Sequence, residues 1–541
     1  MSVEEVEPTE SGDTRAVPRG KICLLGLLGG LQMLDPTVAN TAIVEAGRTL
    51  GFTAAERALG ASISTLALAA TVLASGLAAD RLGRRRVLIA AAVLAFVGNV
   101  IVATAPVAEV YLVGRAIAGI GLGATLAATF AYVRFVTPGP KMSAALGLWA
   151  AVMIAMIIVG LPIGGALAAE SWRAAMLLVP AVLIALVGFI PRVLPVMPRS
   201  GEGPIDYAGL VLIGTSTVLL LYGLSQAAAS LSSPRFYGPV VAGIIGYAAF
   251  GMVEIRKKSA VFPVKLFTNG IFVAAVVAGV AWNFTEAVVM LSTSNLWQYT
   301  KSASPLEVTI LQAPLLLVLL VASLLAGKYL SKHGDRLRQI LGLGFTACVL
   351  GLLLMAAAKQ SSPAWVVVPG IAVVGIGLGL ISVPQSAMFI SQAPAKFFGP
   401  VTSFRTTVGQ IGYAIGLTLS VVLVEGFGHA RFAGALEKAG LATPSQVAVG
   451  ISDVRAFVND RVEPTTAAGK AAVEAAQKAY TQGFDATMVL CAAFIALLGF
   501  AALFSIDAGG TIDRFKRRIR PASAQNRGVA QEDGQGPDDV S

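Results

Sequence analysis

The sequence predicts an all-α integral membrane protein with fourteen transmembrane helices, arranged as two six-helix bundles related by a parallel repeat, with a two-helix insertion between them. Hydrophobic residues make up 56% of the 541 residues and charged residues only 13%, whereas a soluble domain carries about 25% charged residues. Polar breaks divide the chain into fourteen apolar runs, each near the length of about 20 residues that crosses a hydrocarbon core. Two pairs of short motifs also recur in the same order in both halves.

The apolar runs can be placed in order along the chain. They lie near 22–44, 58–79, 87–105, 108–131, 143–169, 172–191, 208–228, 237–255, 270–297, 306–329, 339–358, 364–390, 399–424 and 484–505. The stretch 425–481 is too polar to span, and its Ala, Glu and Lys spacing predicts one or two amphipathic helices on the outer face. The expected organisation is a tail over 1–20, a first bundle over 21–191, the insertion over 207–256, a second bundle over 265–505 that includes this outer loop, and a tail over 506–541.

The internal repeat locates the insertion. Residues 76–85 and 327–336 share glycines and basic residues at matching positions, and the Gly-Ile-Gly-Leu-Gly run at 119–123 recurs at 375–379. The offsets are 251 and 256 residues, and both correspond to a shift of eight spans, not six. Spans seven and eight are therefore extra. A parallel duplication inside a membrane protein is typical of transporters.

Basic residues mark one set of alternate loops, which predicts the orientation. This set comprises Arg81, Arg84, Arg85, Arg86, Arg134, Lys141, Arg192, Arg199, Arg256, Lys257, Lys258, Lys265, Lys328, Lys332, Arg336, Arg338 and Lys396. By the positive-inside rule these loops and both termini are cytoplasmic. The net charge of +10 is thus mainly a topology signal and a means of contacting anionic membrane lipids. Nucleic-acid binding is excluded because the basic residues form no single face.

The sequence predicts no metal site and no cofactor. Cys23, Cys348 and Cys491 lie in apolar runs without metal spacing, and His333 and His429 are the only histidines. A Gly-x4-Gly-Lys-Ser/Thr loop for ATP phosphates is missing from the sequence. We expect a monomer that binds a small-molecule substrate and protons.

Several short motifs occur within the predicted spans and in the loops between them. They are Leu34, Asp35, Pro36, Thr37, Val38, Ala39 and Asn40 in span one; Gly76, Asp80, Arg81, Gly83, Arg84 and Arg85 after span two; Arg115, Gly119 and Gly121 in span four; Gly160, Pro162, Gly164 and Gly165 in span five; and Trp172, Arg173, Pro180, Ser304, Pro305 and Leu306 beyond. In these residues the chain resembles the major facilitator superfamily, specifically its fourteen-span drug:proton antiporter branch. The resemblance implies the major facilitator fold in a bacterial-type cell (inner) membrane.

The chain also departs from the pattern of that branch. Pro162 stands one place later than the pattern has it, and Ala118 stands where span four usually carries Gln. Leu59 and Ser64 replace aromatic residues that are usual in span two. These departures put the substrate pocket in doubt while leaving the fold and the antiport class little affected.

The loop after span two predicts a conformational latch. Gly76 and Asp80 are one helical turn apart, so a helix packed over Gly76 can approach the carboxylate. The resemblance implies that this helix is the start of span thirteen at Gly399, whose positive N-terminus would attract Asp80 and close the cytoplasmic side. Arg81, Gly83 and Arg84 belong to the same signature. The alternative is that Asp80 is an ordinary surface acid and the arginines only set the topology.

Span five carries a flat strip of small residues. Gly160, Gly164 and Gly165 let another helix pack backbone to backbone, and Pro162 bends or weakens the helix. We expect a seam that resists leakage during the switch between states. Tight packing without a coupling role is the alternative.

Charged residues inside the spans predict which side chains bind the proton and which bind the substrate. Asp35 lies well inside span one, where burying a carboxylate costs about 2.5–3.5 kcal/mol; low dielectric favours its neutral form and makes proton uptake possible. Arg115 is the expected permanent charge beside it, although it could instead bond only backbone carbonyls. Glu286 lies midway along span nine with Trp282 one turn before it, an arrangement that suits an organic cation. Gln298 could line the same cavity. The competing interpretation pairs Glu286 with Arg405 of span thirteen as a buried structural ion pair.

These observations predict a secondary transporter that exports lipophilic, cationic compounds in exchange for protons by alternating access. Export of an endogenous metabolite or lipid, or proton-coupled nutrient uptake, is the alternative within transport. An integral-membrane enzyme would need a cluster of polar catalytic groups at one membrane face, whereas the acids here lie singly within spans. We therefore expect a protein that is not an enzyme.

Overall fold

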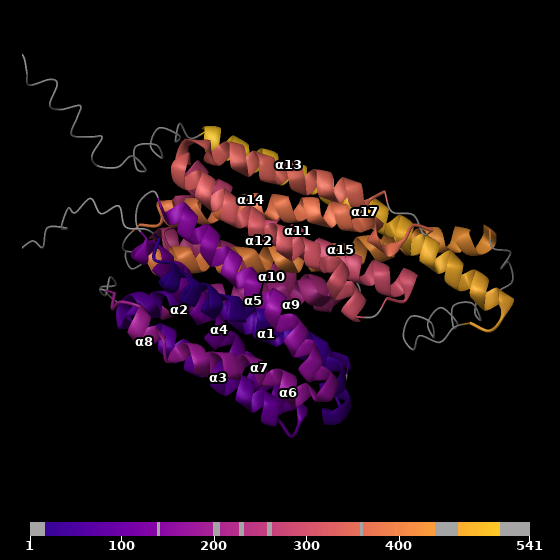
Figure 1. Ribbon diagram of the computed structural model, residues 1–541, viewed down its shortest axis with the longest axis horizontal. Helices are drawn as coiled ribbons and strands as arrows, with labels where there is room; N and C mark the ends of the chain where they lie inside the picture. Colours follow the sequence, from indigo (N-terminus) through magenta and orange to yellow (C-terminus); the bar gives the residue numbers. More distant parts are fainter. Residues whose placement is uncertain are drawn as a thin grey trace, which may run out of the picture.

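The computed structural model describes residues 17–52, 54–137, 141–197, 206–226, 232–256, 262–303, 305–357, 361–394, 397–438 and 464–508, and these residues form helices without a strand (Figure 1). Fourteen helical stretches in this part of the chain are long and apolar enough to cross a membrane. The predicted all-helical, fourteen-span fold class is therefore confirmed.

The helices follow the predicted order. The first bundle comprises α1 (Arg19–Leu50), α2 (Ala54–Leu82), α3 (Arg84–Thr104), α4 (Ala108–Val136), α5 (Met142–Glu170) and a sixth span broken into α6 (Trp172–Met176), α7 (Leu178–Val187) and α8 (Ile190–Val193). The insertion comprises α9 (Tyr207–Gln226) and α10 (Pro234–Arg256). The second bundle comprises α11 (Gly270–Lys301), α12 (Pro305–Lys332), α13 (Leu337–Met355), α14 (Val368–Gln392), α15 (Phe398–Lys438) and α17 (Ala467–Ala508), with short 3-10 turns at Val264–Thr268, Gly334–Arg336 and Ala364–Val367.

The repeated Gly-Ile-Gly-Leu-Gly runs make equivalent contacts in the two bundles. In α4, Gly119 faces the backbone of α2, while Gly121 faces the backbone of α3 at Ala95. In α14, Gly375 faces the backbone of α12 at Leu315, while Gly377 faces α13. A Cβ at any of these positions would collide with the neighbouring helix, so glycine permits the close approach. The repeated glycine motif in the sequence therefore corresponds to a repeated mode of helix packing.

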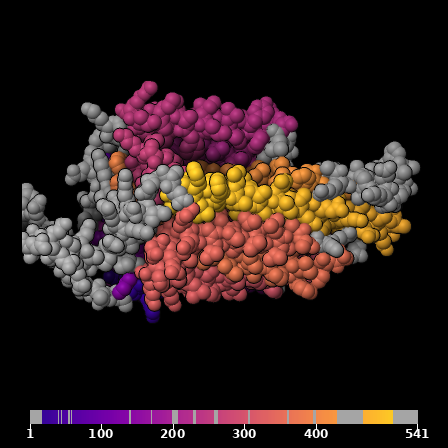
Figure 2. Space-filling model, turned by 90° about the horizontal axis from the view of Figure 1, so that it is seen from above, coloured from indigo at the N-terminus to yellow at the C-terminus, as the bar shows by residue number. Residues whose placement is uncertain are grey.

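The insertion packs on the outside of both bundles. Within it, Gly223 of α9 and Gly243 of α10 bring the two helices together. Gly214 of α9 faces the carbonyl of Ala70 in α2, and the hydroxyl of Thr418 in α15 donates to the carbonyl of Leu224 at 2.9 Å. In Figure 2 the insertion forms the magenta layer along one edge of the molecule. It thus touches one helix from each bundle.

The predicted outer loop differs from the structure. Instead of separate amphipathic helices over 425–481, α15 continues to Lys438 and α17 already begins at Ala467, so the two spans extend beyond the bundle as long helices (Figure 1). Phe432 of α15 packs against Ala472 and Ala475 of α17. This apolar contact explains why the helices continue: each extension covers the other's apolar side. Residues 439–463 of the predicted loop lie outside the described residues.

The two bundles meet at the predicted cytoplasmic end through a pair of equivalent contacts. A Cβ at Gly76 of α2 would lie 2.6 Å from the carbonyl oxygen of Gly399, at the start of α15. Its repeat partner Gly327 of α12 faces the carbonyl oxygen of Ser143 at 2.7 Å, near the start of α5. In each case the second helix of one bundle packs on the fifth helix of the other. The glycine of the loop signature is required for this close approach.

Candidate functional site

A buried ion pair joins the first and fourth helices. Nη1 of Arg115 in α4 donates to Oδ2 of Asp35 in α1 at 2.6 Å. Asp35 is 2% exposed and Arg115 is fully buried. The hydroxyl of Ser64 in α2 lies 3.5 Å from the same carboxylate oxygen, because Gly119 lets the backbones of α2 and α4 touch at Ser64. Three helices of the first bundle therefore place polar groups around one carboxylate.

The pair leaves hydrogen-bonding capacity unused. Nε and Nη2 of Arg115 and the hydroxyl of Tyr111 are buried without a hydrogen-bond partner. Tyr111 lies one turn before Arg115 on α4, and its ring packs edge-on against Phe52 and Trp172. A charged guanidinium with free donors beside a carboxylate can hold a water molecule or respond when the carboxylate takes up a proton. The guanidinium therefore keeps donors available for a further acceptor.

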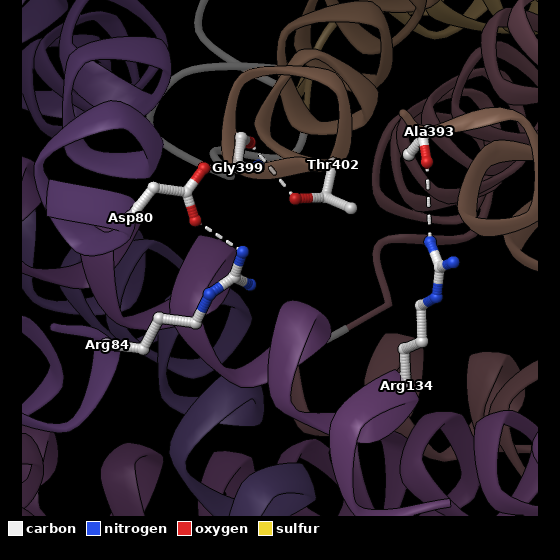
Figure 3. Close-up of polar contacts among 6 residues, drawn as sticks. All are labelled: Asp80, Arg84, Arg134, Ala393, Gly399 and Thr402. Atoms are coloured by element: carbon white, nitrogen blue, oxygen red, sulfur yellow. Dashed lines mark hydrogen bonds and ion pairs between the residues drawn. The ribbon is translucent and has the colours of Figure 1, made fainter. Parts of the chain in front are cut away.

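Asp80 links the first bundle to the second. The backbone N–H of Gly399 donates to Oδ2 of Asp80 at 2.7 Å, and the guanidinium of Arg84 forms an ion pair with Oδ1 (Figure 3). The carboxylate thus meets the positive end of α15, while Thr402 in the first turn of α15 donates to the carbonyl of Gly399 at 3.0 Å. Asp80 and Arg84 are both buried, so Asp80 is not an ordinary surface acid.

The loop signature around Asp80 has a backbone requirement of its own. Gly83 joins α2 to α3 with a φ of 97°, in the region that favours glycine. This turn sets Arg84 at the start of α3, one turn from Asp80, while Arg81 lies half-buried in the last turn of α2. The turn therefore positions Arg84 for the ion pair.

Arg134 makes a second contact between the bundles that sequence reasoning missed. From the last turn of α4, its Nη1 donates to the carbonyl of Ile390 at 3.0 Å, at the end of α14. It also donates to the carbonyl of Ala393 at 3.4 Å, just after that helix (Figure 3). A cation is stabilised at the negative C-terminus of a helix, as an anion is at the N-terminus. Asp80 and Arg134 therefore bind the two helix ends on either side of the short connection from α14 to α15. In the sequence Arg134 counted only toward the topology.

The small residues of α5 pack differently from the expected strip. Cβ atoms at Gly160 and Gly164 would collide with the side chains of Leu34 and Val38 of α1, so these two glycines make room for side chains; α1 approaches the α5 backbone most closely at its own Gly26 and Gly30. Gly165 has no neighbour within 4 Å at its Cβ position, and Pro162 is exposed within a helix that continues through it. At Gly160 and Gly164 the strip therefore receives side chains of α1, while the role of this helix pair as a seam stays a prediction.

Glu286 lies midway along α11 with a nearly buried side chain, 9% exposed. In the part of the chain that the structure describes, its carboxylate has no hydrogen bond and no ion pair. Trp282 lies one turn earlier on the same face, and its indole N–H donates to the carbonyl of Leu378 in α14 at 2.9 Å, which fixes the ring. Glu286 is thus an unpaired acid beside an anchored aromatic ring.

Two other predicted neighbours of Glu286 lie elsewhere. Gln298 lies twelve residues further along α11, roughly 18 Å at a rise of 1.5 Å per residue, and its amide donates to the hydroxyl of Ser294 at 2.8 Å. Arg405 is also distant, because Gly412 packs on Val280 and Gly416 on Phe284. This register sets Arg405 about thirteen residues, roughly 20 Å along the helix axis, from the level of Glu286. The alternative of a Glu286–Arg405 ion pair is therefore not what the structure contains.

No group of three or more His, Cys, Asp or Glu side chains that could hold a metal ion occurs among the described residues. The candidate functional groups instead form three separate sets. These are the Asp35–Arg115 pair in the first bundle, the Asp80 and Arg134 contacts between the bundles, and Glu286 in the second bundle.

Comparison with known proteins agrees with this architecture. Over 426 residues the chain is 23% identical to the multidrug efflux pump LfrA of Mycolicibacterium smegmatis, covering 78% of this chain and 82% of that protein. It is 23% identical over 346 residues to the riboflavin transporter RibZ of Clostridioides difficile, covering 63% of this chain and 74% of that protein.

Among solved structures, the crystal structure of a bacterial homologue of the human lysosomal transporter Spinster, inward-facing and unoccupied, superposes with a TM-score of 0.57 at 14% identity over 92% of this chain and 99% of that one. Residues 25–417 match the Major Facilitator Superfamily. Together with the duplicated helical bundles, this match makes the protein a multi-pass membrane transporter and not an enzyme, and the chain belongs to the Major Facilitator Superfamily.

Proposed function

We propose that this transporter exports lipophilic cationic compounds in exchange for protons, in a bacterial-type cell (inner) membrane with both termini cytoplasmic. The observation that carries the proposal is the buried Asp35–Arg115 pair at 2.6 Å. A carboxylate within a span is expensive and is retained where it moves ions or protons. The similarity to a multidrug efflux pump over most of the chain supports the direction of transport and the substrate class.

The proton acts through the Asp35–Arg115 pair. Protonation of Asp35 removes the charge that compensates Arg115, so the attraction between α1 and α4 weakens and the free donors of Arg115 seek another acceptor. A change of charge at this position can bias the packing of the first bundle. Proton entry from outside would thereby be linked to the arrangement of the bundles.

The positive charge of the substrate is bound in the second bundle. Glu286 has no ionic partner among the described residues, so an organic cation can supply its counter-charge without breaking a protein contact. The ring of Trp282, held by its bond to Leu378, offers a cation–π surface one turn away. Substrate and proton are thus bound by acids in different bundles, and rocking of the bundles couples them.

The test is transport in proteoliposomes with an imposed pH gradient. Purified protein should move ethidium against its concentration gradient into the more acidic compartment, as protons move the other way. An ionophore that collapses the pH gradient should abolish this movement. Ethidium flux that ignores the pH gradient would contradict proton exchange. Flux of ethidium down its own gradient only would contradict coupled export.

A second function is favoured by one observation. The similarity to a riboflavin transporter covers 74% of that protein, so transport of an endogenous metabolite is the alternative. In that case the same vesicles would carry riboflavin with a pH-dependent rate while leaving ethidium behind.

A further inference from the structure

Arg405 is an interior cation that has no oxygen partner among the residues the structure describes. From the second turn of α15, its guanidinium lies 4.7 Å from the ring centroid of Phe130 in α4 and 5.9 Å from that of Trp149 in α5. Both rings are buried and belong to the other bundle. In the described residues no carboxylate or carbonyl accepts a hydrogen bond from Arg405, and its Nε is buried without a partner.

Three other interior arginines of this chain each have at least one oxygen partner. Arg84 and Arg115 pair with carboxylates, and Arg134 donates to two carbonyls. A guanidinium has five donors and stays charged, and removing it from water without acceptors is costly. Two aromatic faces offset part of that cost through cation–π attraction but accept none of the hydrogen bonds. The free donors of Arg405 therefore point to a ligand.

The position of Arg405 suits a substrate that arrives from the cytoplasm. It lies six residues after Gly399 on α15, about 9 Å from the predicted cytoplasmic end of that helix. Its side chain keeps partial exposure while the next residues, Thr406 and Thr407, are buried. The rings that cover it come from the opposite bundle, so separation of the bundles at this end uncovers the guanidinium.

We propose that Arg405 is an anion-binding subsite, at which a carboxylate of an aromatic substrate accepts paired hydrogen bonds from the guanidinium. In the closed arrangement Phe130 and Trp149 cover the cation, and in the open arrangement the substrate's carboxylate replaces them. A planar carboxylate matches the fork of donors that Arg presents. The inference rests on the proposed export function and adds a class of substrate to it, namely compounds that carry an acidic group as well as a cationic one. This subsite is separate from Glu286, roughly 20 Å away along the helix axis.

The test uses rhodamine B, a zwitterion whose cationic ring system carries a free carboxylate, and its ethyl ester, a cation in which that carboxylate is esterified. Purified protein in proteoliposomes of phosphatidylcholine should transport both. Arg405→Gln should raise the KM for rhodamine B by about tenfold or more, the effect of losing charge-assisted hydrogen bonds, and leave the KM of the ester nearly unchanged. Arg405→Lys, which keeps the charge without the fork, should fall between the two. An equal loss for both dyes would mean that Arg405 only holds the bundles together, and would overturn the subsite.

Two controls separate this result from other causes. Arg173 also stacks on a ring, with its guanidinium 4.1 Å from the centroid of Trp172, but it donates to the carbonyl of Ala105. Arg173→Gln should leave the ratio of the two KM values unchanged, and a matching change of ratio would overturn the assignment to Arg405.

Adding phosphatidylglycerol tests whether a lipid headgroup is the natural anion: loss of the difference between the dyes in that membrane would overturn a substrate site. If the ester itself is not driven by the pH gradient, the proposed export function fails instead.

Discussion

The carboxylate of Asp80 accepts a hydrogen bond from the backbone N–H of Gly399, a residue 319 positions later in the chain, at 2.7 Å. The contact joins the end of α2 to the first turn of α15 and so joins the two bundles. A charge at a helix terminus contributes about 0.3–1 kcal/mol in exposed positions and up to about 2 kcal/mol when partly buried. That range is enough to shift the balance between two conformations of a transporter.

Asp80→Asn should move the resting protein toward the inward-open state by about 1 kcal/mol, roughly a fivefold change in the ratio of states. The substitution removes the charge from the positive end of α15 and leaves Arg84 without its partner. A cysteine placed in the cytoplasmic half of the cavity should then react faster with a membrane-impermeant maleimide. Gly76→Ala should act in the same direction without a charge change, because the new Cβ would meet the carbonyl of Gly399. Equal labelling of parent and both variants would refute the latch.

Arg134→Gln should also open the cytoplasmic end, and by a similar amount, because it removes a cation from the C-terminus of α14. The matched control is Arg86→Gln, since Arg86 is an exposed basic residue in the first turn of α3 and its loss changes the positive charge at this end of the bundle by the same amount. Maleimide labelling of the same reporter cysteine measures both. If the two arginine variants label alike, the bonds of Arg134 to Ile390 and Ala393 contribute nothing to closure. A double variant with Asp80→Asn should show an additive shift, because the two residues hold different helices.

Asp35→Asn should abolish substrate-induced proton release from the purified transporter, because the amide is nearly isosteric with the carboxylate but does not titrate. The variant should also melt at a lower temperature, since breaking a buried pair costs about 3–5 kcal/mol by leaving Arg115 uncompensated. Adding Arg115→Gln should recover the melting temperature without recovering proton release. Proton release that persists in the Asn variant would remove Asp35 from the coupling mechanism.

Glu286→Gln should weaken transport of quaternary ammonium compounds and have a smaller effect on neutral substrates, because only a charged ligand gains Coulomb energy from the carboxylate. Its melting temperature should stay near that of the parent, since no ion pair with Arg405 is broken. Thermal unfolding and cation transport are measured on the same preparation. Full retention of cation transport by a stable variant would show that Glu286 does not bind the substrate charge.

Most of the fold could be predicted from the sequence, because whether a segment crosses the bilayer depends on the hydropathy of its own residues and not on its neighbours in space. Apolar runs of sufficient length predicted fourteen spans and their order, and the repeated glycine runs predicted the duplication that α4 and α14 display in their packing. Hydropathy could not predict that α15 and α17 extend beyond the bundle, because those turns are stabilised by contact with each other through Phe432 and Ala472.

The candidate site likewise has features that the sequence predicted and features that only the tertiary structure decided. The sequence by itself determined which charges lie within spans, since a buried acid or arginine is conspicuous in an apolar run: Asp35, Arg115 and Glu286 needed no structure to be singled out. Only the tertiary structure decided their partners, because partners depend on the register and rotation of helices that are far apart in the chain. The packing of Gly412 on Val280 and Gly416 on Phe284 keeps Arg405 away from Glu286 and turns it toward the rings of Phe130 and Trp149. A shift of one helical turn, about 5.4 Å, would change these contacts without changing a single hydrophobic run.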